Sequence, residues 1–166
     1  MPRRAYVETT IFSYLAARPS RDLVTAAHQR VTADWWSMAP SRYELVASVV
    51  VLQEITIGDP SLAERRRALL GDLPLLELSA ESRRLTQHLL NLKLLPPHAT
   101  ADAEHVAVAT IGGVDYLVTW NLRHLAGAVV RRRLEDALRQ LGFHPPTLCT
   151  PEELLADTSD IGGPDV

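Results

Sequence analysis

The stretch that decides the fold is residues 99–121, ATADAEHVAVATIGGVDYLVTWN. Its first half places small apolar side chains at the spacing of one helix face, which is typical of a helix packed closely against a sheet. Gly112 and Gly113 follow, and glycine tolerates the left-handed turn in which many helices end. Residues 114–119 are almost continuously apolar, as expected of a strand buried on both faces of a parallel sheet. The stretch therefore predicts a helix, a tight turn and a buried parallel strand.

The same alternation of strand and helix patterns continues on both sides of this stretch. Short apolar runs predict further strands at residues 5–7, 43–51, 73–78 and 147–149, and helix patterns occur at residues 9–15, 23–39, 61–70, 80–95, 122–125 and 131–141, with one final helical turn from residue 151. Strands alternating with helices predict one α/β domain over residues 1–155, with a mostly parallel sheet that helices cover on both faces. Residues 156–166 are polar and rich in glycine, and we expect them to form a disordered tail.

Composition narrows the class of protein. A chain of 166 residues with 46% hydrophobic residues is long enough for one domain with its own core. Its single cysteine, Cys149, excludes an intramolecular disulfide and fits a reducing cytoplasm. No apolar run approaches the roughly 20 residues that span a bilayer, so a membrane protein is not expected. The net charge of −3 neither indicates nor excludes binding to nucleic acid.

Oxygen-bearing side chains follow the predicted strands near their carboxyl ends. Glu8 follows the first strand, Glu54 the second and Asn121 the strand of the opening stretch, while Asp102 begins the helix before that strand. Because the carboxyl ends of parallel strands meet at one edge of a sheet, these side chains are expected to converge. Converging carboxylates repel one another unless a cation lies between them, and Mg²⁺ and Mn²⁺ prefer oxygen ligands. Such an ion can activate water for attack on a phosphodiester.

A simpler interpretation of the same residues stays open. Acidic side chains often cap helices or solvate loops, and Asp102 alone could favour its helix N-terminus. His105, on the same predicted helix, could be a histidine packed in the core. Spacing alone therefore does not decide between a metal site and helix capping.

Four short motifs, in this order along the chain, resemble those of the PIN-domain family. The matching segments are YVETT at residues 6–10, SVVVLQE at residues 48–54, DAEHVA at residues 102–107 and LVTWNLRH at residues 117–124. The segment CTPEEL at residues 149–154 is also similar to one branch of the family. Within the family, the chain specifically resembles VapC-type ribonuclease toxins of type II toxin–antitoxin systems, over about residues 4–155.

The resemblance implies a three-layer α/β/α fold with a central parallel sheet, and cleavage of RNA that depends on Mg²⁺ or Mn²⁺. It assigns catalysis to Glu8, Glu54, Asp102 and Asn121, of which the first three would hold the metal. It also implies a homodimer and a partner antitoxin that covers the cleft. The residues expected to support the site or contact the substrate are Thr9, His105, Thr119, Arg123 and His124.

This sequence departs from the family pattern at two of those positions. Glu8 stands at a position where the family usually has aspartate. Asn121 stands at a position where the family often has aspartate. Glu8 keeps the charge on a longer arm, whereas Asn121 offers an uncharged carbonyl oxygen that weakens a second metal site. Alternatively, the Asn121 amide positions a neighbouring acidic side chain, the substrate or water by donating hydrogen bonds. Glu104 stands where the family usually has an apolar residue, and either replaces a ligand or, as we favour, faces solvent.

The leading hypothesis is therefore an endoribonuclease toxin. One alternative is a catalytically weak PIN domain that binds RNA or protein, and another is a different metal-dependent phosphohydrolase on the same kind of sheet. Nucleotide-cofactor enzymes are not expected, because the sequence has no Walker or Rossmann glycine-rich motif. Candidate basic contacts for RNA are the arginine triplets at residues 65–67 and 131–133, which equally fit solvated helix faces.

Overall fold

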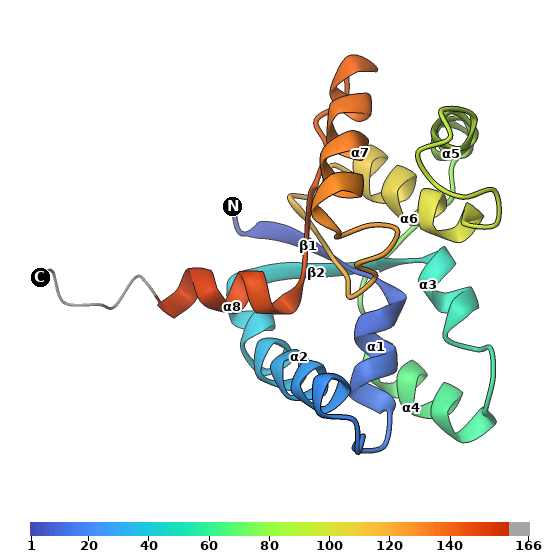
Figure 1. The fold of residues 1–166 in the computed structure, drawn as a ribbon. Coiled ribbons are helices and arrows are strands. Elements are labelled where there is room, and N and C mark those ends of the chain that lie inside the picture. Colours follow the sequence, from blue (N-terminus) through green and yellow to red (C-terminus); the bar gives the residue numbers. More distant parts are fainter. Residues whose placement is uncertain (160–166) are drawn as a thin grey trace, which may run out of the picture.

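The structure, a computed structural model, describes residues 1–159 (Figure 1). The strands in this range are β1 (Arg3–Val7), β2 (Tyr43–Ser48), β3 (Leu75–Leu76), β4 (Tyr116–Val118) and β5 (Thr147–Cys149). The helices are α1 (Thr9–Ala16), α2 (Leu23–Arg42), α3 (Val49–Glu54), α4 (Pro60–Leu70), α5 (Ala80–Asn91), α6 (Thr100–Ile111), α7 (Ala128–Gln140) and α8 (Pro151–Ser159). Across this described range, no helix combines the length and apolar character needed to cross a bilayer.

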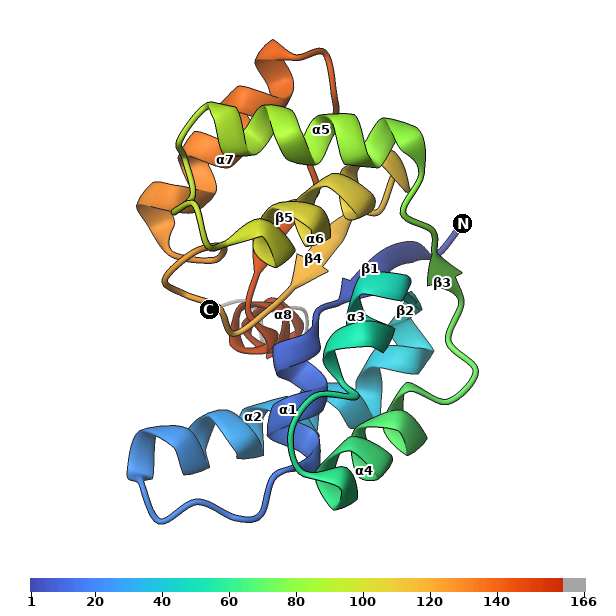
Figure 2. The ribbon, with the colours of Figure 1, turned by 90° about the vertical axis from the view of Figure 1, so that its right-hand side faces the viewer.

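The strands form one parallel sheet in the order β3-β2-β1-β4-β5. From β1 the chain moves outward through β2 to β3, then returns to the other side of β1 and moves outward through β4 to β5. Helices α5, α6 and α7 lie on one face of the sheet, and α1, α2 and α4 lie on the other (Figure 1, Figure 2). The predicted three-layer α/β/α architecture is confirmed, and the strand order reverses between β1 and β4. Open α/β sheets bind their ligands outside such a reversal point.

The two central strands and helix α6 form the middle of the core. Tyr6 of β1 pairs in register with Leu117 of β4, and both side chains are fully buried. Helix α6 turns the small, buried side chains of Ala103 and Ala107 inward, as its sequence predicts. Gly113, in the connection between α6 and β4, has a φ of 64°, a conformation that glycine adopts without steric cost. The opening stretch therefore forms the helix, turn and buried strand that its pattern indicates.

The structure corrects the prediction for the second strand. β2 ends at Ser48, and the next residues form helix α3, although a run of valines favours a strand. The Ser48 hydroxyl oxygen accepts hydrogen bonds from the backbone N–H groups of Val50 (3.1 Å) and Val51 (3.3 Å), which caps the helix. Glu54 is consequently carried by the last turn of a helix rather than by a loop after a long strand.

Smaller differences concern element ends. Helix α2 continues past Pro40, which lies in the last turn, and residues 122–125 form turns rather than a helix. Helix α7 begins earlier than expected, at Ala128, and β3 is shorter. Helix α8 runs to Ser159, so the expectation of a disordered tail is wrong for residues 156–159. The remainder of that expected tail, residues 160–166, lies outside the described residues.

Candidate active site

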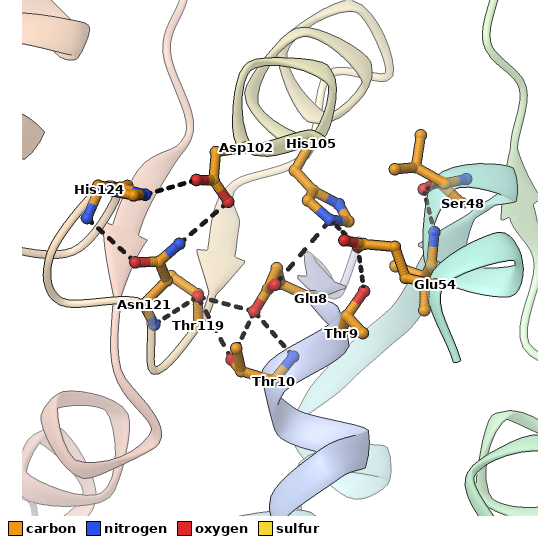
Figure 3. A network of polar contacts seen from close by, with 12 residues as sticks. Glu8, Thr9, Thr10, Ser48, Glu54, Asp102, His105, Thr119, Asn121 and His124 are labelled. Atoms are coloured by element: carbon orange, nitrogen blue, oxygen red, sulfur yellow. Dashed lines mark hydrogen bonds and ion pairs between the residues drawn. The ribbon is translucent and has the colours of Figure 1, made fainter. Parts of the chain in front are cut away.

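The four side chains assigned to catalysis from the sequence lie at the carboxyl edge of the sheet, around the reversal point between β1 and β4 (Figure 3). Glu8 directly follows β1, and Asn121 follows β4 by three residues along the chain. Asp102 lies in the first turn of α6, and Glu54 ends α3. Four segments that are distant in sequence thus bring polar side chains to the place where parallel α/β sheets bind ligands.

Glu8 is almost fully buried, with 3% of its surface exposed. It is the N-cap of α1, and its Oε2 accepts hydrogen bonds from the backbone N–H of Thr10 (3.0 Å) and from the Thr119 hydroxyl (2.8 Å), as well as from the Thr10 hydroxyl. Burial raises the pKa of Glu8, although the charge of His105 and these hydrogen bonds act in the opposite direction. The fold therefore fixes this carboxylate in place but gives it little solvent to stabilise its charge.

Glu54 faces Glu8 across the imidazole of His105 (Figure 3). Its Oε1 accepts a hydrogen bond from the Thr9 hydroxyl at 2.6 Å and lies 2.5 Å from Nε2 of His105. The same Nε2 lies 3.9 Å from Oε1 of Glu8. Burial opposes ionisation of Glu54, but the hydrogen bonds from His105 and Thr9 and the charge of His105 lower its pKa overall. Thr9 and His105, both expected near the site, thus contact Glu54 directly.

His105 is buried in the core and still reaches the carboxylates. Its Nδ1 lies 2.7 Å from the hydroxyl oxygen of Tyr6, which in turn lies 2.6 Å from the hydroxyl oxygen of Ser48. Burial favours the neutral ring, but the hydrogen bond with Glu54 and the charges of Glu8, Glu54 and Asp102 raise the pKa of His105. His105 is therefore a buried core histidine that also contacts one of the candidate carboxylates.

Asp102 belongs to a neighbouring polar group rather than to the pair of glutamates. Its Oδ1 accepts a 3.0 Å hydrogen bond from the side-chain amide of Asn121, and its Oδ2 lies 2.8 Å from Nδ1 of His124. The side-chain oxygen of Asn121, Oδ1, accepts the backbone N–H of His124 at 3.0 Å. Thr119 joins the two groups, because its hydroxyl donates to Glu8 and accepts the backbone N–H of Asn121 at 2.9 Å. Arg123 is exposed beside them.

Three functional contacts come from residues that the sequence analysis did not assign to the site. Tyr6 contacts His105 directly, Ser48 contacts Tyr6, and Thr10 holds Glu8. Tyr6 and Thr10 lie within the YVETT motif and Ser48 begins the next motif, so the signal was present in the matched segments. Tyr6 lies on β1, Ser48 on β2 and Thr10 on α1, and only the fold brings these side chains to their partners.

The basic triplets are partly committed to structural contacts. Arg66 donates hydrogen bonds to the backbone oxygens of Ile55 (3.0 Å) and Ile57 (2.6 Å), which holds the connection between α3 and α4. Arg131 donates to the backbone oxygen of Leu148 (3.0 Å) and pairs with Glu153 (2.8 Å). These arginines therefore stabilise the fold, whereas Arg123 is exposed and lies two residues after Asn121 along the chain.

The chemistry of the donor set fits a divalent cation. Glu8, Glu54 and His105 each offer one ligand atom, and these atoms lie within 4.8 Å of one another. A buried carboxylate with a raised pKa beside a second carboxylate is stabilised by a positive charge between them. Carboxylate oxygens suit Mg²⁺ and Mn²⁺, and an imidazole nitrogen suits softer transition metals. The group could therefore bind a metal ion.

Comparison with known proteins supports the fold. No family model matches the sequence, and no match was found among curated proteins. Among solved structures, the chain is similar to one in the crystal structure of VapBC2 from Rickettsia felis bound to a DNA fragment from their promoter. The TM-score is 0.55 and the identity 15%, over 89% of this chain and 96% of that chain. A likeness at this identity shows a shared fold, which agrees with the architecture that the PIN-domain resemblance implies.

Proposed function

We propose that this protein is a divalent-metal-dependent endoribonuclease that acts as the toxin of a type II toxin–antitoxin pair. The single observation that carries the proposal is the convergence of Glu8, Glu54, Asp102 and Asn121 at the reversal point of the sheet. Helix capping explains Glu8, and the first-turn position suits Asp102, but neither explains Glu54, which ends its helix. The order of the four motifs along the chain and the shared fold add support.

Under this proposal, Glu8, Glu54 and Asp102 would hold Mg²⁺ or Mn²⁺. Such an ion supplies a Lewis acid that stabilises the negative charge developing on a phosphodiester during hydrolysis. The protein contributes fixed positions: Thr10 and Thr119 hold Glu8, and Asn121 and His124 hold Asp102. Groups held in place before the substrate arrives lose less entropy and need less reorganisation at the moment of reaction.

The RNA backbone would approach from the exposed side of this edge. Arg123 is exposed two residues after Asn121 and can offer a guanidinium to phosphate, for which its planar donors are suited. His124 is partly exposed, and its ring is already oriented by Asp102. We propose that these two residues contact the substrate, while Arg66 and Arg131 serve the fold.

A cognate antitoxin is the proposed protein partner, together with a second copy of this chain in a homodimer in the cytoplasm. The antitoxin is supported by the similar structure, which is a VapBC2 complex bound to promoter DNA. The homodimer and the cytoplasmic location rest on the resemblance and on the single cysteine.

A catalytically weak domain that binds RNA is the second candidate. Asn121 favours it, because this residue brings no charge and both its amide and its carbonyl group are used by Asp102 and His124. Under this alternative, the same edge would hold RNA without hydrolysing it.

The test is cleavage of a mixed-sequence RNA by the purified chain with Mg²⁺, with Mn²⁺ and with EDTA. The proposal predicts cleavage that needs the metal and is lost in Glu8→Gln but kept in Glu44→Gln, a carboxylate variant at the opposite end of the strands. RNA binding without cleavage in either metal would favour the binding module. Cleavage that persists in EDTA or in Glu8→Gln would contradict the metal site.

A further inference from the structure

A chain of buried hydrogen bonds leads from β2 through β1 and α6 to the active-site edge. It runs from the Ser48 hydroxyl to the Tyr6 hydroxyl (2.6 Å), then to Nδ1 of His105 (2.7 Å), and from Nε2 of His105 to Oε1 of Glu54 (2.5 Å). Ser48, Tyr6 and His105 are each at most 1% exposed, so no solvent can take over a missing hydrogen bond. The direction of each bond is therefore set by the number of protons and lone pairs that these groups possess.

The direction begins at Ser48. A hydroxyl oxygen has one proton and two lone pairs, and the Ser48 oxygen already accepts the backbone N–H groups of Val50 and Val51. Toward Tyr6 it can therefore only donate. The Tyr6 oxygen accepts this proton, and its own proton has one acceptor left among its partners, which is Nδ1 of His105. Nδ1 must then carry no proton when the ring is neutral.

In the opposite neutral tautomer, one hydrogen-bond donor and one acceptor have no partner. If Nδ1 of His105 carried the proton, it would donate to Tyr6, and the Tyr6 proton would have no acceptor in a fully buried place. At the same time the lone pair of Nε2 would face an oxygen of Glu54 at 2.5 Å. A buried unpaired donor and two facing lone pairs are both unfavourable.

We propose that Tyr6, as a positioning residue, and Glu54 together fix neutral His105 as the tautomer protonated at Nε2. His105 then orients Glu54 and is not itself a metal ligand. A protonated Nε2 that donates to a carboxylate has no lone pair with which to bind a cation. This holds even though the ligand atoms of Glu8, Glu54 and His105 are close enough together to surround one ion. The consequence for cleavage rests on the proposed function, whereas the tautomer itself does not.

The hydrogen bond from His105 helps to fix the orientation of the Glu54 carboxylate. Thr9 and His105 both place their hydrogen bonds on Oε1 of Glu54, and no described residue donates to Oε2. One carboxylate oxygen is thus held from two sides and the other is left for a cation or substrate. A residue that hydrogen-bonds to a metal-binding side chain orients it. Removing such a residue commonly changes metal affinity or activity by about 10–100-fold.

The direct test is the tautomer of His105, measured by long-range ¹H–¹⁵N correlation spectra of the full chain at mildly alkaline pH. The proposal predicts a protonated Nε2 and an unprotonated Nδ1 in the wild type. In Tyr6→Phe, which removes the hydroxyl but keeps the ring, Glu54 should still hold the proton on Nε2, and the Nδ1 signal should shift to that of a ring nitrogen that accepts no hydrogen bond. The control Tyr116→Phe removes a hydroxyl that contacts Arg3 instead, and it should leave the His105 signals unchanged. A wild-type ring protonated at Nδ1 overturns the proposal, whether or not the protein cleaves RNA.

A second measurement separates an orienting histidine from a ligand. Pulsed electron paramagnetic resonance of the Mn²⁺-loaded chain detects a nitrogen bound directly to the ion. The spectra of the wild type and of His105→Gln should both lack a coordinated nitrogen from this position, and Tyr6→Phe should lower the rate constant for cleavage by about 10–100-fold with KM little changed. A coordinated nitrogen that disappears in His105→Gln overturns the proposal. If no Mn²⁺ binds at all, the proposed function fails, and the tautomer spectra still decide the role of Tyr6.

Discussion

The side-chain amide of Asn121 donates a 3.0 Å hydrogen bond to Oδ1 of Asp102. The other oxygen of Asp102, Oδ2, lies 2.8 Å from Nδ1 of His124. The backbone N–H of His124 donates to the side-chain oxygen of Asn121. The three residues thus form a closed arrangement that holds one carboxylate. An asparagine suits this place because its amide can donate, whereas an aspartate can only accept. The geometry accounts for an uncharged residue at a position where the family pattern often has a carboxylate.

Asn121→Asp is expected to slow cleavage rather than improve it. The change removes the hydrogen-bond donor to Asp102 and puts a second negative charge where that donor now lies. The metal-free protein should therefore lose on the order of 1–3 kcal/mol of unfolding free energy. Urea denaturation in EDTA measures the stability, and RNA cleavage over a range of Mn²⁺ concentrations measures the activity. The exposed Asn91→Asp on α5 is the matched control. Faster cleavage at lower Mn²⁺ would mean that Asn121 is a weakened metal ligand.

Asp102→Asn should abolish most metal-dependent cleavage and leave the fold intact. The variant loses the negative charge that attracts the cation, and metal stabilisation of the transition state is worth several kcal/mol, which corresponds to about 100-fold or more in rate. Circular dichroism checks the fold, and single-turnover cleavage gives the rate. Asp136→Asn, an exposed change on α7, should behave as wild type. If Asp102→Asn binds Mn²⁺ and cleaves RNA at the wild-type rate, Asp102 is not a ligand of the ion.

Binding of Mg²⁺ should raise the melting temperature through the two glutamates. A ligand at about 100 times its Kd stabilises the native state by about 2.7 kcal/mol, or roughly 5–10 °C for a chain of this size. Glu8→Gln and Glu54→Gln should each lose most of this shift, while the surface variant Glu44→Gln should keep it. The measurement is a thermal melt with and without Mg²⁺. An undiminished shift in Glu54→Gln would show that Glu54 does not hold the ion.

The metal-free protein should be most stable at mildly acidic pH. The pKa of His105 is raised, so its contribution to stability is complete below the pKa of the unfolded chain and is lost as the pH rises through the folded pKa. The raised pKa of Glu8 acts in the same direction at lower pH. The pKa of Glu54 is lowered, so its contribution is present above the unfolded pKa and is lost as the pH falls through the folded one.

This pH dependence can be followed by urea denaturation in EDTA at several pH values. The decline above neutrality should flatten in His105→Gln, because that variant has no group to titrate there. His144→Gln, far along the chain on the connection after α7, should keep the wild-type profile. A wild-type stability that rises steadily from mildly acidic to alkaline pH would contradict the assigned direction of the His105 shift.

The sheet could be predicted from the sequence because its signals are local. The buried run of β4, the small face of α6 and the glycine turn between them each follow from residue type and spacing. The end of β2 could not be predicted in this way, because three valines favour a strand and only the Ser48 cap makes them begin a helix. A local helix cap overrides the strand preference of the valines at that point.

The site was predictable as a set of positions but not as a set of contacts. Strand ends and a helix start place four polar residues at one edge, and the sequence shows that. Which carboxylate meets which partner depends on side chains from strands and helices that are paired only in the fold, as with Thr9 and Glu54 or Asn121 and Asp102. The contacts of His105 with Tyr6 and Glu54 need the spacing between α6 and β1, which no local pattern encodes.

We propose that Glu8 and Glu54 share a divalent cation at the carboxyl edge of the sheet. It is tested most directly by anomalous X-ray diffraction from crystals of the full chain soaked with Mn²⁺. The account predicts an anomalous peak in contact with carboxylate oxygens of both Glu8 and Glu54, with His105 still hydrogen-bonded to Glu54. Mn²⁺ bound only elsewhere on the protein, with no peak between these two carboxylates, would contradict it.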